Sequence, residues 1–73
     1  MSKIDELLAR ISDGAWHNLF EITRSLRIDY PKLEKIVKLL REFSFIQKKG
    51  NEIRIDFETK KLLESATRDL NRA

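Results

Sequence analysis

The segment from Leu19 to Leu40, LFEITRSLRIDYPKLEKIVKLL, holds two amphipathic helical patterns in immediate succession. In the first, Leu19, Ile22 and Leu26 recur at the spacing of one helix face. In the second, the positions predicted to be buried are Leu33, Ile36, Val37, Leu40 and Phe43. A link of only about three residues separates the two, so the helices must be neighbours that cross at a steep angle. The rest of the chain has to complete a core around that pair.

The ends of both helices carry recognisable start signals. Asn18 followed by Glu21 resembles a capping box, and it opens a helix of about eight residues with Phe20 assigned to the inner face. The second helix is predicted over 29–43, because Asp is a good capping residue and Pro31 is tolerated in a first helical turn.

An N-terminal helix is expected before this pair. Ser2 can cap it, and a glycine stop at residues 12–14 ends it. Its predicted inner face is Ile4, Leu7, Leu8 and Ile11. Ala15 to His17 is predicted to be a brief strand or an extended link.

After residue 43 the apolar period changes from helical to alternating. The alternating positions are Phe45, Ile46, Ile53, Ile55 and Phe57, and they flank a Gly50–Asn51 turn. This pattern predicts an antiparallel hairpin over about residues 45–57 with basic residues near its tip. A last helix is predicted over about residues 58–70, with Leu62 or Leu63, Ala66 and Leu70 at helical spacing. The expected fold class is α+β.

Length and charge add two constraints. At 73 residues the chain is expected to form a single domain over 1–73, near the lower size limit for a core without disulfides or metal. The net charge is only +3, but it is unevenly distributed: residues 1–23 sum to −2, residues 24–54 to +5, and residues 55–73 to zero. A positive middle segment indicates one face with an acidic partner.

Several functional classes have no support in the sequence. There is no cysteine, a single histidine and only two glycines, so thiol chemistry, a zinc site and a phosphate-cradling loop are not expected. We expect no enzymatic activity, no cofactor and no small-molecule substrate. No signal peptide or membrane-spanning run is seen, and a cytoplasmic location is expected.

The predicted order of elements is helix, short strand, helix, tight turn, helix, hairpin and helix. This order resembles the winged helix-turn-helix family, and in particular its small regulators from prokaryotes, including archaea. The resemblance rests on DGAWHNLFEI, on SLRIDYPKLEKIVKLLREFSFI and on KKGNEIRI. The resemblance implies a three-helix core with a β-hairpin wing and a fourth helix, and it places the helix-turn-helix at about 18–43. It also implies that the helix Asp29–Phe43 lies in the DNA major groove. Gln47–Arg54 is then the wing, which contacts the DNA backbone.

A DNA-binding face follows from this resemblance and from the helical period. The predicted contacts to double-stranded DNA are Tyr30, Lys32, Lys35, Lys38, Leu39, Arg41, Lys48, Lys49, Asn51 and Arg54. A lysine row neutralises phosphates but discriminates poorly between bases. Tyr30 is expected to pack at the start of its helix, with a phosphate contact as the alternative. An outward Leu39 suits either a thymine methyl group or a protein interface. Arg27 stands where many such turns have glycine.

Other interpretations remain open at this point. The lysines can be a solvated helix face partly paired with Glu34 and Glu42. Trp16 is expected to plug the core, and His17 to have a surface or hydrogen-bonded structural role. The main alternative function is a protein-interaction module without DNA binding. In that case the stripe of Leu63, Ala66 and Leu70 covers the chain's own core or pairs with a second chain as a homodimer.

Overall fold

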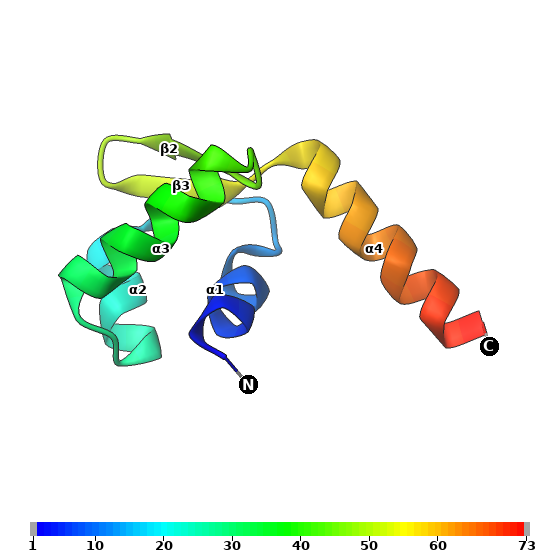
Figure 1. The fold of residues 1–73 in the computed structure, drawn as a ribbon, viewed down its shortest axis with the longest axis horizontal. Helices are drawn as coiled ribbons and strands as arrows, with labels where there is room; N and C mark the ends of the chain where they lie inside the picture. The colour runs from blue at the N-terminus through cyan, green and yellow to red at the C-terminus, as the bar shows by residue number, and fades with distance from the viewer. Residues whose placement is uncertain (1, 73) are drawn as a thin grey trace.

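The computed structural model describes residues 2–72, and it describes side chains over residues 2–66. Within these residues the fold is α+β, as predicted, with four helices and a three-stranded antiparallel sheet (Figure 1). The elements are α1 (Lys3–Ile11), β1 (His17–Asn18), α2 (Leu19–Leu26), α3 (Tyr30–Glu42), β2 (Ile46–Lys49), β3 (Glu52–Ile55) and α4 (Phe57–Arg72).

Side-chain caps fix the start of the first two helices. The hydroxyl of Ser2 accepts a hydrogen bond from the amide of Asp5 at 3.2 Å. The side-chain oxygen of Asn18 accepts from the amides of Phe20 at 2.8 Å and of Glu21 at 3.4 Å. Both caps confirm the predicted start signals. Asp29 precedes α3, as expected, but its side chain makes no capping hydrogen bond.

The turn between α2 and α3 uses a left-handed residue that is not glycine. Arg27 has φ 52° and ψ 51°, and its amide donates to the carbonyl of Thr23. Ile28 follows with its amide bonded to the same carbonyl at 3.1 Å and its side chain buried. A left-handed conformation costs about 1–2 kcal/mol for a residue with a Cβ. The turn therefore absorbs Arg27, and the buried Ile28 side chain holds it in place.

The sheet has the order β1-β3-β2, with β3 in the centre. His17 pairs with Ile53, and Ile46 pairs with Ile55. The extended segment predicted at residues 15–17 is a strand only from His17 onward. Gly50 has φ 59° in the two-residue loop between β2 and β3, where tight hairpin turns require a positive φ.

One core joins α1, α2, α3 and the sheet. Its buried side chains are Leu7, Ile11, Leu19, Ile22, Leu26, Ile28, Leu33, Val37, Leu40, Ile46, Ile53 and Ile55. Ile4, Leu8, Tyr30 and Ile36 lie half-buried at its edge. Most of the predicted inner faces are thereby confirmed.

Three aromatic residues expected in the interior, Trp16, Phe20 and Phe43, are instead exposed. Phe45 and Phe57, at the two ends of the predicted hairpin, are exposed as well. Phe43 follows the last residue of α3, so the helical period no longer directs its side chain inward. Ser44 has φ 60°, which turns the chain before Phe45. Phe57 begins α4 instead of ending β3, so the strand alternation has already stopped.

The last helix leaves the body of the molecule (Figure 1). Its start is capped by Asp56, whose side chain accepts from the amide of Thr59 at 3.3 Å. Leu62 and Leu63 are 70% and 43% exposed, and Ala66 is exposed too. Leu62, Leu63 and Ala66 are not among the buried core residues, so over residues 57–66 nothing supports the alternative in which the stripe covers the chain's own core. The side chain of Leu70 lies outside the described residues.

No helix in the described part of the chain combines the length and the apolar character needed to cross a membrane.

Candidate functional site

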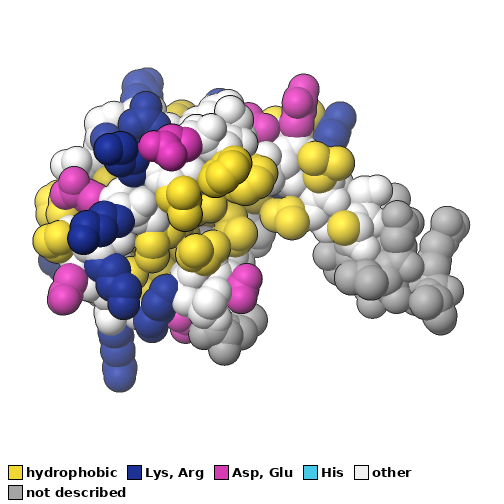
Figure 2. Space-filling model, viewed as in Figure 1, with side chains coloured by type: hydrophobic (Ala, Val, Ile, Leu, Met, Phe, Trp, Pro, Cys, Tyr) yellow, Lys and Arg dark blue, Asp and Glu magenta, His cyan; other side chains and the backbone are white. Residues whose placement is uncertain are grey.

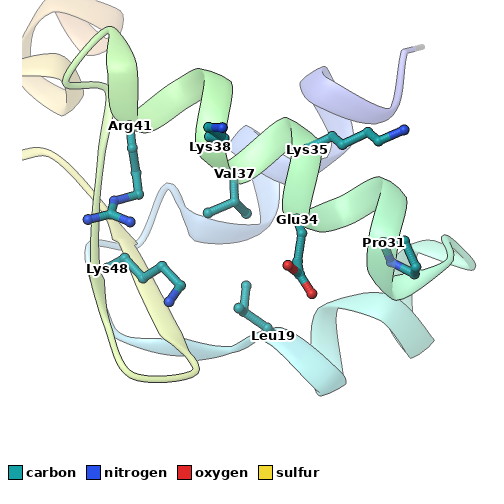
Figure 3. A pocket seen from close by; sticks show the side chains of 8 residues that line it. All are labelled: Leu19, Pro31, Glu34, Lys35, Val37, Lys38, Arg41 and Lys48. Atoms are coloured by element: carbon teal, nitrogen blue, oxygen red, sulfur yellow. The ribbon is translucent and has the colours of Figure 1, made fainter.

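An open groove runs between α3 and β2, with the start of α2 beneath it (Figure 3). Its walls carry four basic side chains and one acidic one. The lining residues are Leu19, Pro31, Glu34, Lys35, Val37, Lys38, Arg41 and Lys48. The groove therefore brings three basic residues of the predicted major-groove helix together with one from the predicted wing.

Burial of one face of α3 directs its basic residues into this groove. Leu33, Val37 and Leu40 are 0–4% exposed and fix the rotation of the helix. With these inward, Lys35 and Lys38 are carried to the outer side, because neighbours on a helix face recur every three or four residues. Both lysines are exposed.

The register of the hairpin brings Lys48 to the same groove. Lys48 lies directly opposite Ile53, and paired residues of an antiparallel sheet share one face. The Ile53 side chain is fully buried under the helices, so Lys48 also projects toward the helical side. Figure 3 shows the amine of Lys48 extending into the space below α3.

The groove is strongly positive, with Glu34 as its only acidic lining residue. Among the described residues, the ion pairs join Lys3 to Glu6 and His17 to Asp13, and neither pair lies in the groove. Lys35, Lys38, Arg41 and Lys48 are all exposed and keep their charge for a partner. The floor is apolar and consists of Leu19 and Val37. Such a surface attracts a polyanion.

Six of the ten predicted contacts lie outside the groove, among them Lys32, Lys49 and Asn51. Lys32 is exposed on α3 but does not line it. Lys49 pairs with Glu52 and so projects from the opposite face of the hairpin to Lys48. Asn51 is exposed in the hairpin loop, and its backbone carbonyl accepts a hydrogen bond from the amide of Leu19 at 2.8 Å. That bond ties the tip of the hairpin to the start of α2.

Arg54 is engaged within the protein. Its guanidinium carbon lies 4.6 Å from the ring centre of Trp16, and its Nε donates to the side-chain oxygen of Gln47 at 2.8 Å. Gln47 in turn donates to Asp56 at 3.4 Å. A cation over an indole ring is stabilised by the ring quadrupole. Trp16 and Gln47 therefore hold Arg54 on the face of the hairpin away from the groove.

The two apolar candidates on α3 have different surroundings. Tyr30 is half-buried, and its ring stacks on Phe20 with centroids 5.0 Å apart. This contact confirms that Tyr30 packs at the start of its helix. Leu39 is 45% exposed, in agreement with its predicted outward orientation. Leu39 does not line the groove, although it follows the groove residue Lys35 by one helical turn.

His17 has the hydrogen-bonded structural role that its sequence context predicts. Its Nε2 lies 2.8 Å from a carboxylate oxygen of Asp13. The hydrogen bond from His17, with another from the amide of Ala15, holds the pKa of Asp13 below its ordinary value of 3.8. Within the described residues, no three His, Asp or Glu side chains are grouped as metal ligands would be.

The sequence did not indicate that Pro31, Leu19 and Val37 line the groove with the basic residues. It did indicate the approach of Lys48, because a two-residue loop at Gly50–Asn51 sets Lys48 opposite the apolar Ile53. The same register places Gln47 opposite Arg54, which was a sequence-level signal that these two side chains would meet.

A comparison of the chain with protein-family models, curated proteins and solved structures found no match in any of the three.

Proposed function

We propose that this chain is a winged helix-turn-helix domain that binds duplex DNA, and that it acts as a small transcriptional regulator. The observation that carries the proposal is the convergence of Lys35, Lys38, Arg41 and Lys48 on one open groove. Helix α3 supplies three of these cations and strand β2 supplies the fourth. If the lysines only kept the outer face of α3 in solvent, a cation from the hairpin would not be expected in the same groove.

The arrangement of elements supports the same function. A three-residue link, residues 27–29, joins α2 and α3, as in motifs whose second helix enters the major groove. The hairpin follows α3 directly and presents Lys48 beside it. In this proposal α3 enters the groove of the DNA, and the hairpin contacts the adjoining backbone.

The chemistry of the side chains predicts the mode of binding. Lysine ammonium groups act as point charges and contact phosphates without reading the sequence. Arg41 is the only arginine that lines the groove, and its planar guanidinium suits a bidentate contact with guanine. We therefore propose binding that is dominated by phosphate contacts and has modest sequence preference.

Fluorescence anisotropy of a labelled random-sequence duplex across a salt series tests this proposal. Each phosphate contact contributes a log–log slope of about −0.9, so four cations predict a total slope of roughly −3 to −4. A measured slope in that range supports a phosphate-contacting groove. Absence of binding at about 50 mM salt, where such contacts are strongest, contradicts the proposal.

Paired charge reversals assign the binding to the groove. The double variant Lys35→Glu/Lys48→Glu removes two groove cations, and we expect it to abolish measurable binding. The matched control is Arg10→Glu/Lys61→Glu, which changes the net charge equally at exposed positions outside the groove. Equal loss in both variants indicates a general charge effect and contradicts a specific groove.

The second candidate is a protein-interaction module without DNA binding. The specific observation in its favour is the exposure of Phe43 and Phe45, whose rings stack on each other with centroids 5.7 Å apart. Large exposed aromatic side chains are typical of protein interfaces. The anisotropy experiment separates the two functions, because a module of this second kind leaves the duplex unbound.

A further inference from the structure

Two sets of apolar side chains on this chain are exposed to solvent. The first, here called the apolar flank, consists of Leu39, Phe43 and Phe45, which are 45%, 62% and 40% exposed. The second, the α4 stripe, consists of Leu62, Leu63 and Ala66. Figure 2 shows hydrophobic side chains gathered beside α3 and continuing onto the first turns of α4.

The total surface of the chain is larger than a compact monomer of its mass requires. The accessible area is 5550 Å² for 8.7 kDa. The size scaling of monomeric proteins gives about 4,700 Å² for that mass. The excess is about 800 Å², which matches the area that each partner buries in a standard protein interface.

The shape of the chain agrees with this excess. Its radius of gyration is 12.5 Å, with extents of 39 × 23 × 20 Å. A compact domain of this length has a radius of gyration of about 11 Å. The additional length comes from α4, which projects from the body (Figure 1).

Contacts at the start of α4 set its outward direction. The amide of Asp56 donates to the carbonyl of Phe45 at 2.9 Å, and the Asp56 side chain caps the helix through Thr59. One turn later, the amine of Lys60 reaches the carbonyl of Asp13 at 3.4 Å. These bonds join the first turn of α4 to the base of the hairpin and to the loop after α1. Folding α4 back onto its own body moves Lys60 away from the Asp13 carbonyl and therefore breaks that bond.

We propose that two copies of this chain exchange their last helices, so that the α4 stripe of each packs on the apolar flank of the other. The arrangement is isologous, because one pair of surfaces is used twice about a two-fold axis. It buries both exposed surfaces and leaves the polar side of α4, with Lys60, Lys61 and Glu64, in solvent. The inference does not depend on DNA binding.

The exchanged dimer leaves the basic groove open. None of Leu39, Phe43 and Phe45 lines the groove, so a helix docked on the apolar flank leaves Lys38, Arg41 and Lys48 open. It passes beside Lys35, which lies one helical turn before Leu39 on α3. The dimer consequently presents two basic grooves related by the same two-fold axis. If the proposed function holds, such a pair suits two half-sites on one duplex.

The first test is the mass of the full chain in solution, by light scattering coupled to size-exclusion chromatography. We expect twice the chain mass of 8.7 kDa. Leu62→Glu places a charge in the α4 stripe and is expected to give a monomer, whereas Lys61→Glu places the same side chain on the polar side and keeps the dimer. Circular dichroism checks that both variants fold. A monomeric native chain overturns the proposal.

Cysteine cross-linking then distinguishes helix exchange from pairing of two α4 helices. The chain has no cysteine, so single-cysteine variants react only at the introduced position. We expect a mixture of Phe43→Cys and Leu62→Cys chains to be joined efficiently by a short bis-maleimide, and either variant alone to be joined poorly. Cross-linking of Leu62→Cys with itself, without the mixed product, overturns the exchange.

Discussion

Helices α3 and α4 have the same apolar period but different surroundings. In α3 the periodic residue Leu33 is fully buried, whereas in α4 the periodic residue Leu62 is 70% exposed. The period of a sequence pattern specifies which side chains share a face of the helix. It does not specify what covers that face, which depends on how the chain connects the helix to its neighbours.

The connections of the two helices explain the difference. A three-residue turn links α3 to α2, and the hairpin follows α3 closely, so both ends of the helix are held against the core. In contrast, the bonds of Asp56 and Lys60 join α4 to the body at its first turn. In the following turn the side chain of Leu62 is 70% exposed.

The largest effect is expected from truncating the two periodic leucines in turn. Leu33→Ala leaves a cavity in the core and should lower the free energy of unfolding by about 2–5 kcal/mol. Leu62→Ala should change it by less than about 0.5 kcal/mol in dilute protein, as surface substitutions do. Urea denaturation of both variants measures the difference.

Protein concentration sharpens the same comparison. The Leu33→Ala effect should be independent of concentration, since the residue is buried within one chain. If a second copy covers α4, the free energy of unfolding of the native chain should rise with protein concentration. The destabilisation caused by Leu62→Ala should then also grow with protein concentration. Equal effects of the two substitutions in dilute protein would show that α4 is packed against its own body.

A second comparison concerns Glu34 in the groove and Glu64 on α4. Glu34→Gln removes the only carboxylate that lines the groove. A unit charge about 6 Å from a phosphate contributes roughly 0.7 kcal/mol in a water-like dielectric, so duplex affinity should rise about threefold. Glu64→Gln makes the same charge change on α4 and should have a smaller effect. Anisotropy at one fixed salt concentration compares them, and equal gains would contradict a local role for Glu34.

A third test stabilises the body without touching α4. Arg27→Gly relieves the left-handed strain in the turn, although it also makes the unfolded chain more flexible. The balance of these terms predicts a gain of about 0.5 kcal/mol in the free energy of unfolding. Thermal and urea denaturation measure it, with Gly50→Ala as the opposite case, because that substitution introduces strain at φ 59°. A destabilising Arg27→Gly would indicate that the arginine side chain itself stabilises the turn.

Local signals predicted most of the fold. The caps at Ser2 and Asn18, the proline at the start of α3 and the glycine of the hairpin loop act within a few residues, so the sequence displays them directly. The burial of Phe43 was predicted wrongly, because the helical period was extended past the last residue of α3. A pattern loses its meaning where the element ends.

The basic groove was predictable only in part. The lysines of α3 follow from the helical period, and Lys48 follows from the register of a two-residue hairpin loop. The surroundings of Arg54 could not be predicted from the hairpin alone, because Trp16, which lies over its guanidinium, comes from the link after α1. Contacts between segments far apart in the sequence have no local signature, and this limits prediction of which charges stay available.

The smallest expected effect lies at Asp13, beside the junction between the body and α4. His17 and the amide of Ala15 bond its carboxylate, and Lys60 of α4 reaches its backbone carbonyl. Because the pKa of Asp13 is lowered in the folded chain, the charged carboxylate stabilises the fold above its unfolded pKa. That contribution is lost as the pH falls through the lower, folded pKa.

Asp13→Asn should therefore destabilise the chain slightly at neutral pH and converge with the native chain in acid. Denaturation from pH 7 to pH 2 measures the difference, which we expect to be smaller than that of Arg27→Gly because Asp13 is exposed. If the backbone bond from Lys60 also depends on this carboxylate, the variant loosens the first turn of α4, and dimer formation weakens at neutral pH. An unchanged dimer with reduced stability would confine the role of Asp13 to the body.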